Sequence, residues 1–173
     1  MSGPIRRPQP TFRRERLAVF DPASPPPALA RLGLPARLLA LWRGWAGGRA
    51  APERTDIDPL AMPALLPHLI LLDAIDGDFR FRLVGEAVNS RYGHGLKGRA
   101  LTELMSGAAL DETLYEHRRC AEDLAGVLVQ NSLEQAGLDD LKLYARLLLP
   151  VGADGGRARH VIGVMEFLES GGG

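Results

Sequence analysis

Cysteine is almost absent from this chain of 173 residues, in which Cys120 is the single one. One cysteine cannot form an intramolecular disulfide, so no covalent cross-link of this kind holds the fold together. Chains of this size bury roughly two thirds of their unfolded surface and have a sufficient core without cross-links. The reducing cytoplasm is therefore the simplest compartment for the protein.

Metal-binding and catalytic patterns are also lacking. His117 and Cys120 make a His-x-x-Cys pair, but structural zinc needs four ligands and the sequence holds no second pair. The GHGLKG stretch at residues 93–98 has the glycine spacing of a dinucleotide site, yet it follows a predicted helix rather than a strand, so we expect a bend there. Because no nucleophile, base and acid can be assigned, we expect no metal site and no enzyme.

Long apolar runs and net charge are missing as well. No run approaches the roughly 20 residues of a membrane span, and the formal net charge is zero. We therefore expect no membrane span and no nucleic-acid partner for the molecule as a whole. Residues 1–28 are rich in arginine and proline, which predicts a disordered basic tail. Contact of this tail with an acidic partner or nucleic acid is the alternative to simple solvation.

The segment at residues 29–48 predicts an amphipathic helix. Pro35 suits a first helical turn, and a Gly-Gly pair ends the segment. One apolar stripe with helical spacing consists of Leu38, Leu41, Trp42 and Trp45. A helix of three turns is not stable alone in water, so this stripe must pack on protein.

Alternation of apolar and polar residues predicts five strands in the rest of the chain. Phe79, Phe81 and Leu83 point to one face, and the arginines between them point to the other. Further strands are predicted at residues 68–73, 127–133, 141–149 and 160–168, with a helix at residues 110–125 and short helical turns before it. This order indicates an α+β domain at residues 49–168, followed by a flexible tail at residues 169–173.

The order of elements and several motifs resemble a family of short, stand-alone bacterial PAS-like proteins. Beyond Trp45, the resemblance is carried by TDIDP (55–59), LLP (65–67), FRLVG (81–85), YG (92–93), LKGR (96–99) and LLLP (147–150). It implies a five-stranded antiparallel sheet with the strands in the order second, first, fifth, fourth, third. Helices would cover one face with a cavity beneath them, in addition to the N-terminal amphipathic helix. The implied function is a non-enzymatic, cytoplasmic sensory or signalling module that acts through protein contacts, with gating by a small apolar ligand left open.

The cavity is expected to gather apolar side chains around one histidine. Its candidate residues are Phe81, Leu83, Tyr92, Leu104, Leu114, His117 and Met165. His117 lies on the helix where haem-binding PAS domains carry their axial ligand, so a haem-bearing or other cofactor-bearing sensor is the alternative function. A core histidine bonded to backbone is the more ordinary interpretation. Cys120 lacks the NCRFLQ surroundings of flavin-binding PAS domains, so no cofactor is assigned.

The amphipathic helix is also where a partner is expected, because PAS domains commonly pair through a helix that precedes the first strand. Its stripe either covers the open face of the protein's own sheet or meets a second copy around a two-fold axis. We expect a homodimer, and contact with another signalling protein is the alternative.

Overall fold

The computed structural model describes residues 11–92, 95–134 and 142–168. In chain order the strands and helices are β1 (Thr11–Phe20), α1 (Gly33–Ala46), β2 (Leu69–Ile75), β3 (Asp78–Val84), α2 (Glu86–Tyr92), α3 (Leu101–Leu104), α4 (Gly107–Asp123), β4 (Gly126–Glu134), β5 (Lys142–Asp154) and β6 (Arg157–Leu168). Short 3-10 turns occupy Pro27–Arg31, Arg54–Asp56, Pro59–Ala61 and Leu66–His68. The predicted α+β class is confirmed.

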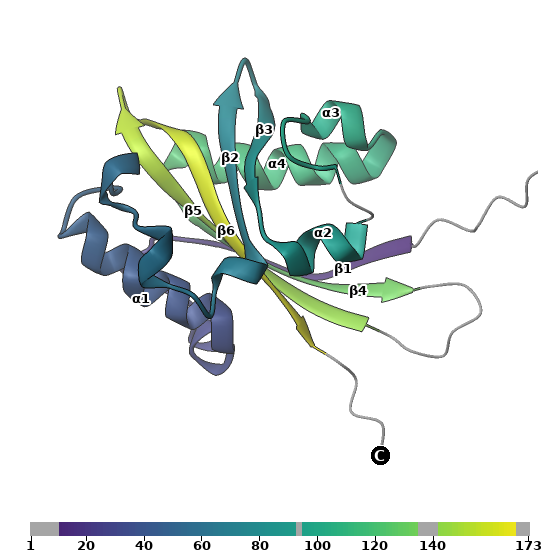
Figure 1. The fold of residues 1–173 in the computed structure, drawn as a ribbon, viewed down its shortest axis with the longest axis horizontal. Coiled ribbons are helices and arrows are strands. Elements are labelled where there is room, and N and C mark those ends of the chain that lie inside the picture. Colours follow the sequence, from purple (N-terminus) through teal and green to yellow (C-terminus); the bar gives the residue numbers. More distant parts are fainter. Residues whose placement is uncertain (1–10, 93–94, 135–141, 169–173) are drawn as a thin grey trace, which may run out of the picture.

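One antiparallel sheet organises the molecule, with strands in the order β1-β4-β5-β6-β2-β3 (Figure 1). The five strands β3-β2-β6-β5-β4 stand in the order that the PAS resemblance implies. The sixth strand, β1, pairs with the outer edge of β4 in antiparallel register. The expected strand count of five is therefore corrected to six.

The N-terminal strand also corrects the expectation of a disordered tail at residues 1–28. The stretch ends in the apolar residues Leu17, Ala18, Val19 and Phe20, and four such residues are enough for a half-buried strand. Leu17 and Val19 pack on one face of the sheet, and Ala18 and Phe20 pack on the other. Because β4 supplies the hydrogen-bond partners, the segment orders without a helix or a long apolar run. Residues 1–10 lie outside the described part of the chain.

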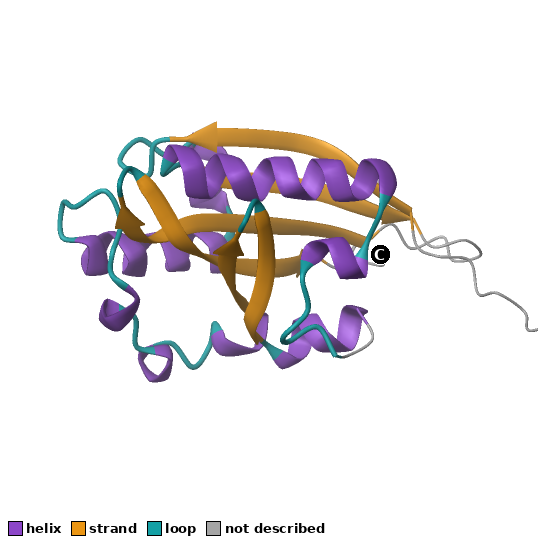
Figure 2. Ribbon diagram, turned by 90° about the horizontal axis from the view of Figure 1, so that it is seen from above, coloured by secondary structure: helices purple, strands orange, loops and turns teal. Residues whose placement is uncertain are grey.

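Helices cover both faces of the sheet (Figures 1 and 2). One face carries α2, α3 and α4, whose side chains Val88, Leu101 and Leu114 share a core with the sheet. The opposite face carries α1, which packs against β5 and β6 together with the connector that precedes β2. The molecule thus has two hydrophobic cores, one on each side of the sheet.

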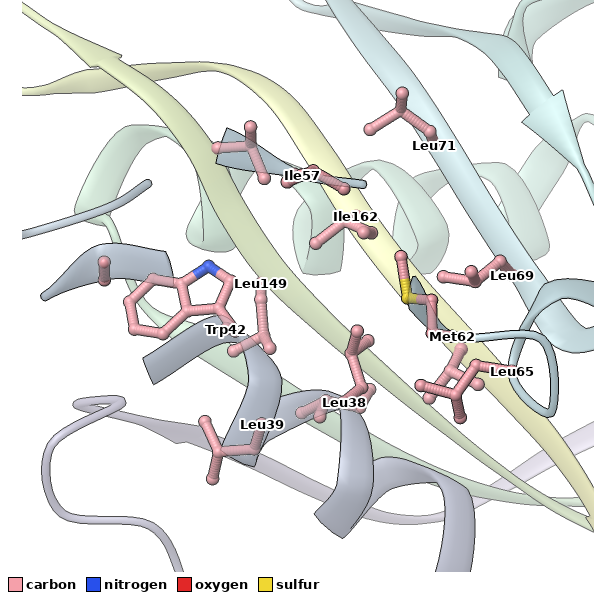
Figure 3. Close-up of a cluster of buried hydrophobic side chains, with 14 of the residues drawn as sticks. Leu38, Leu39, Trp42, Ile57, Met62, Leu65, Leu69, Leu71, Leu149 and Ile162 are labelled. Atoms are coloured by element: carbon pink, nitrogen blue, oxygen red, sulfur yellow. The ribbon is translucent and has the colours of Figure 1, made fainter. Parts of the chain in front are cut away.

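The apolar stripe of α1 lies in the second of these cores (Figure 3). Leu38 is fully buried and Trp42 is 4% exposed, whereas Leu41 and Trp45 are half-buried. The Trp42 indole N–H donates a hydrogen bond of 2.8 Å to the carbonyl oxygen of Pro150 in β5. Of the two burial sites left open by the sequence, the protein's own sheet is the one that receives the stripe. A homodimer built on this stripe would have only the exposed parts of Leu41 and Trp45 to use.

Candidate functional site

The candidate site is the interior between α4 and the sheet, where the sequence predicts a ligand cavity. Leu114 and Met165 are buried in this core, and Phe81 and Leu104 pack against it. His117 is 2% exposed, and its ring lies 5.3 Å from the ring of Phe79, measured between centroids. The structure therefore brings these predicted residues onto one face of the sheet.

One predicted cavity residue lies on the other face of the sheet, and a second reaches the interior only with its hydroxyl. Leu83 packs in the core on the α1 side, because a β-bulge interrupts the pairing of β2 with β3 between Leu71 and Leu72. The extra residue in β3 reverses the alternation, so Leu83 faces away from Phe81. Tyr92, at the end of α2, is 37% exposed as a whole residue, but its hydroxyl lies near Tyr144 and Arg146 in the interior, where burial raises its pKa well above the ordinary value.

A buried ion pair that the sequence analysis did not identify crosses this interior. Arg146 of β5 donates a hydrogen bond to the carboxylate of Glu116 in α4, and the two residues are 9% and 2% exposed. Burial is the largest single effect and lowers the pKa of Arg146, but the Glu116 carboxylate and the Tyr144 and Tyr92 hydroxyls together raise it above the ordinary value. Arg146 therefore stays charged. The available signal was a lone arginine in the apolar run LYARLLL at residues 143–149.

His117 is held in one orientation by the backbone of its own helix. Its Nδ1 lies 2.8 Å from the carbonyl oxygen of Thr113, which can only accept, so Nδ1 carries the hydrogen. The other ring nitrogen, Nε2, is then an acceptor, and it is buried with no partner among the described residues. Burial and the nearby Arg146 lower the pKa of His117 to about 4, against opposing effects of Thr113 and Glu116. The imidazole is neutral at physiological pH.

Nε of Arg146, in the ion pair itself, is a second buried atom without a hydrogen-bond partner in the described part of the chain. It is a donor, whereas Nε2 of His117 is an acceptor. Leaving such a group unsatisfied costs about 1–3 kcal/mol. The interior therefore offers an unmet donor and an unmet acceptor in a lining that is apolar except for Glu116 and the Tyr144 and Tyr92 hydroxyls, an arrangement that suits an ordered water or a small polar group.

A surface hollow of about 730 Å³ lies elsewhere, under the connection from β1 to α1. Its lining includes Phe20 and Pro22 at and just after the end of β1, Trp42 and Arg49 in and after α1, and residues at the end of α4. It holds none of the predicted cavity residues. Arg49 is already bonded to the carbonyl oxygens of Trp45 and Ala46 and to Asp56, so it stabilises the end of α1.

The described residues give no support to metal or thiol chemistry. Within them, no group of three histidine, cysteine or acidic side chains is placed to hold a metal ion. Cys120 is fully buried, and burial raises the pKa of its thiol well above the ordinary value, so it is a core residue rather than a nucleophile. No helix in this part of the chain is long and apolar enough to cross a bilayer.

Comparison with known protein families decides the assignment of the fold. A profile of the PAS domain family matches residues 35–166, from the first turn of α1 to near the end of strand β6. The chain belongs to the PAS domain family. No curated protein and no solved structure matches it. As a PAS domain, the protein is a sensory or signalling module in the general sense, and the predicted family is confirmed.

Proposed function

We propose that this PAS domain is a non-enzymatic sensory module whose interior between α4 and the sheet receives the signal, and whose surface passes it on by protein contact. The observation that carries the proposal is the buried ion pair of Glu116 and Arg146. Within the described residues, Nε of Arg146 in this pair has no hydrogen-bond partner, and neither does Nε2 of His117, the residue after Glu116 in α4. We place the module in the cytoplasm, in keeping with its single buried cysteine.

The chemistry of the interior revises the ligand that the sequence suggests. Most of its lining is apolar, for example Leu114 and Met165, but Arg146 offers an N–H and His117 a lone pair. A small, largely apolar molecule with one hydroxyl, amide or carbonyl group would pack against the apolar lining and also hydrogen-bond to Arg146 or His117, which a hydrocarbon cannot do. Recognition by buried polar groups also gives specificity, because a molecule without the polar group leaves them unpaired.

The ion pair would transmit ligand binding in the interior to the surface of the protein. Glu116 belongs to α4 and Arg146 to β5, so a ligand group that bonds to Arg146 changes the contact between the helix and the sheet. The exposed face of α4 carries charged residues, including Glu112, Arg118 and Glu122. A shift of α4 would alter this face, which a partner protein could read.

Native mass spectrometry of the protein purified from its own host tests the proposal. We expect a retained small molecule in the wild type and its loss in the double variant Glu116→Leu/Arg146→Met, which keeps the volume of the pair without its charge. The matched control is Arg119→Gln/Asp123→Asn, which removes an exposed ion pair of the same helix. Wild-type protein without any retained molecule, or equal retention in both variants, contradicts the proposal.

A haem-bearing sensor is the second candidate, and one observation favours it. The Nε2 atom of His117 is buried, unprotonated and without a partner in the described residues, as an axial haem ligand requires. The Phe79 ring packs against the imidazole, so haem would also need Phe79 to move. A Soret band on haem addition that is absent in His117→Ala would support this candidate. Wild-type protein without such a band removes it.

A further inference from the structure

The two edges of the sheet are closed in different ways. At the β3 edge, the loop before α3 pairs with the strand: Phe81 N–H donates to the carbonyl oxygen of Arg99, and Gly98 N–H donates to that of Phe81. At the opposite edge, β1 covers β4. The family match starts at residue 35 and leaves β1 out, so the PAS core ends at β4 and β1 is an addition to it.

The β4 edge is shaped for this particular strand. Phe20 pairs with Gly126, and a Cβ atom on Gly126 would lie only 2.4 Å from Cζ of the Phe20 ring. The φ angle of Gly126 is not positive, so any residue could adopt this backbone, and what requires glycine here is the space taken by the ring. A strand without an aromatic residue at this register would leave the space unfilled.

The connection from β1 to the rest of the chain is held by a few local bonds. Residues 21–26 form a turn in which Ser24 N–H donates to the carbonyl oxygen of Asp21 at 2.8 Å. Ala23 N–H donates to the Asp21 carboxylate, and Arg43 donates to the carbonyl oxygen of Ala23. Asp21, Pro22 and Ala23 of this turn line the 730 Å³ hollow, and Pro22 is buried. Its prolines, Pro22, Pro25 and Pro26, favour an extended path when these bonds open.

We propose that β1 exchanges between two copies of this protein, so that β1 of each protomer pairs with β4 of the other in a closed two-fold dimer. The partner is a second copy of this chain, because it carries the same strand. That strand includes Phe20, whose ring fills the space above Gly126. Every contact of β1 with the sheet is retained in the exchanged dimer, and the turn at residues 21–26 is the segment that changes. This partner is additional to the proposed function, since the exchange does not require a ligand.

Concentration controls such an exchange. A short connection keeps β1 near its own β4 at an effective concentration on the order of millimolar, so the dimer is favoured only at comparable protein concentrations. Its prolines shift the balance toward the extended connection of the dimer. Because β4 is occupied in both forms, the core should be equally stable in monomer and dimer.

Disulfide trapping in the full chain tests the exchange. Cysteine pairs are placed across β1 and β4 in a Cys120→Ala background, as Leu17→Cys/Val129→Cys in one variant and Ala18→Cys/Leu128→Cys in another. Adjacent antiparallel pairs alternate between the two hydrogen-bonding geometries, so both kinds of site are sampled. The matched control is Leu72→Cys/Val161→Cys across β2 and β6, which should always link within one chain.

After incubation at about 1 mM protein and oxidation, we expect a disulfide-linked dimer on a non-reducing gel for a β1–β4 pair and a monomer for the control. A cross-linked monomer alone for the β1–β4 pairs overturns the proposal. If neither pair oxidises, native mass spectrometry of mixed ¹⁵N-labelled and unlabelled wild type decides. Mixed dimers support the exchange, and their absence overturns it.

The connection provides a second, independent measurement. Replacing Pro25 and Pro26 with alanine should lower the dimer association constant by about two- to fivefold for each proline in each protomer, and with it the dimer fraction, as expected when a conformational restriction is relaxed. Pro63→Ala, at an exposed proline of another connector, is the control and should leave the fraction unchanged. An unchanged dimer fraction in the Pro25/Pro26 variant contradicts the role assigned to the connection.

Discussion

Glu116 of α4 and Arg146 of β5 form an ion pair inside the protein, where the two residues are 2% and 9% exposed. Placing two charges in an interior costs several kcal/mol per ion unless they pair and hydrogen-bond. The pair therefore fixes the position of α4 over the sheet more strictly than apolar packing alone. It also gives the PAS interior a polar centre on which recognition can depend.

The first prediction concerns the energetics of this pair. Glu116→Leu leaves the Arg146 charge buried without its carboxylate, and we expect the free energy of unfolding to fall by about 3–5 kcal/mol. The double variant Glu116→Leu/Arg146→Met should recover most of this loss, because no isolated charge remains. Urea denaturation at pH 7 measures both. A double variant as unstable as the single one would show that packing, not charge, sets the cost.

The second prediction concerns pH and His117. Its pKa is about 4 in the folded protein, below the ordinary value of 6.5, so the unfolded chain binds the proton more readily. Stability contributed by the neutral imidazole is complete above pH 6.5 and is lost as pH falls toward 4, to a total of roughly 3 kcal/mol. We expect the His117→Phe variant to show a flatter stability profile over this window. Leu114→Ala, on the same helix, should lower stability without flattening the profile.

The strands after residue 68 could be predicted because period-two alternation is a local property. The face of Leu83 could not, because the bulge that reverses it arises from pairing between β2 and β3 and has no sequence signal in the strand itself. The partner of Arg146 was hidden for a similar reason, since Glu116 is distant in sequence and looks like one of several acidic residues of α4. For α1, the apolar stripe shows that these side chains must be buried. It does not show whether the protein's own sheet or a second copy covers them.

The third prediction concerns the tryptophan of α1. Trp42 is buried against the sheet and donates a hydrogen bond to Pro150, so Trp42→Ala should lower the free energy of unfolding by about 3–5 kcal/mol. Leu60→Ser changes an apolar residue that is 84% exposed and should have little effect on stability. Thermal and urea unfolding measure both variants. A mild effect of Trp42→Ala would mean that α1 detaches easily from its own sheet and is free to meet a partner.

The fourth prediction concerns the contact between Phe20 of β1 and Gly126 of β4. Gly126→Ala forces a methyl group to within 2.4 Å of the Phe20 ring, and such overpacking costs about 1–3 kcal/mol. Because the backbone of Gly126 is ordinary, the cost should disappear when the ring is also removed. We therefore expect Phe20→Ala/Gly126→Ala to be no less stable than Phe20→Ala alone.

Hydrogen exchange locates the effect. In Gly126→Ala the amides of β1 and the facing amides of β4 should exchange faster, while those of β2 and β6 keep the protection of the wild type. Gly44→Ala is the control, because a Cβ at Gly44 meets no atom within 4 Å and alanine favours the α1 helix. If Gly126→Ala loosens the whole sheet equally, β1 is an integral part of the fold rather than an added strand. If hydrogen exchange becomes faster only at the amides of β1 and β4, β1 opens as a separate unit. The proposed swap of β1 between two copies requires this.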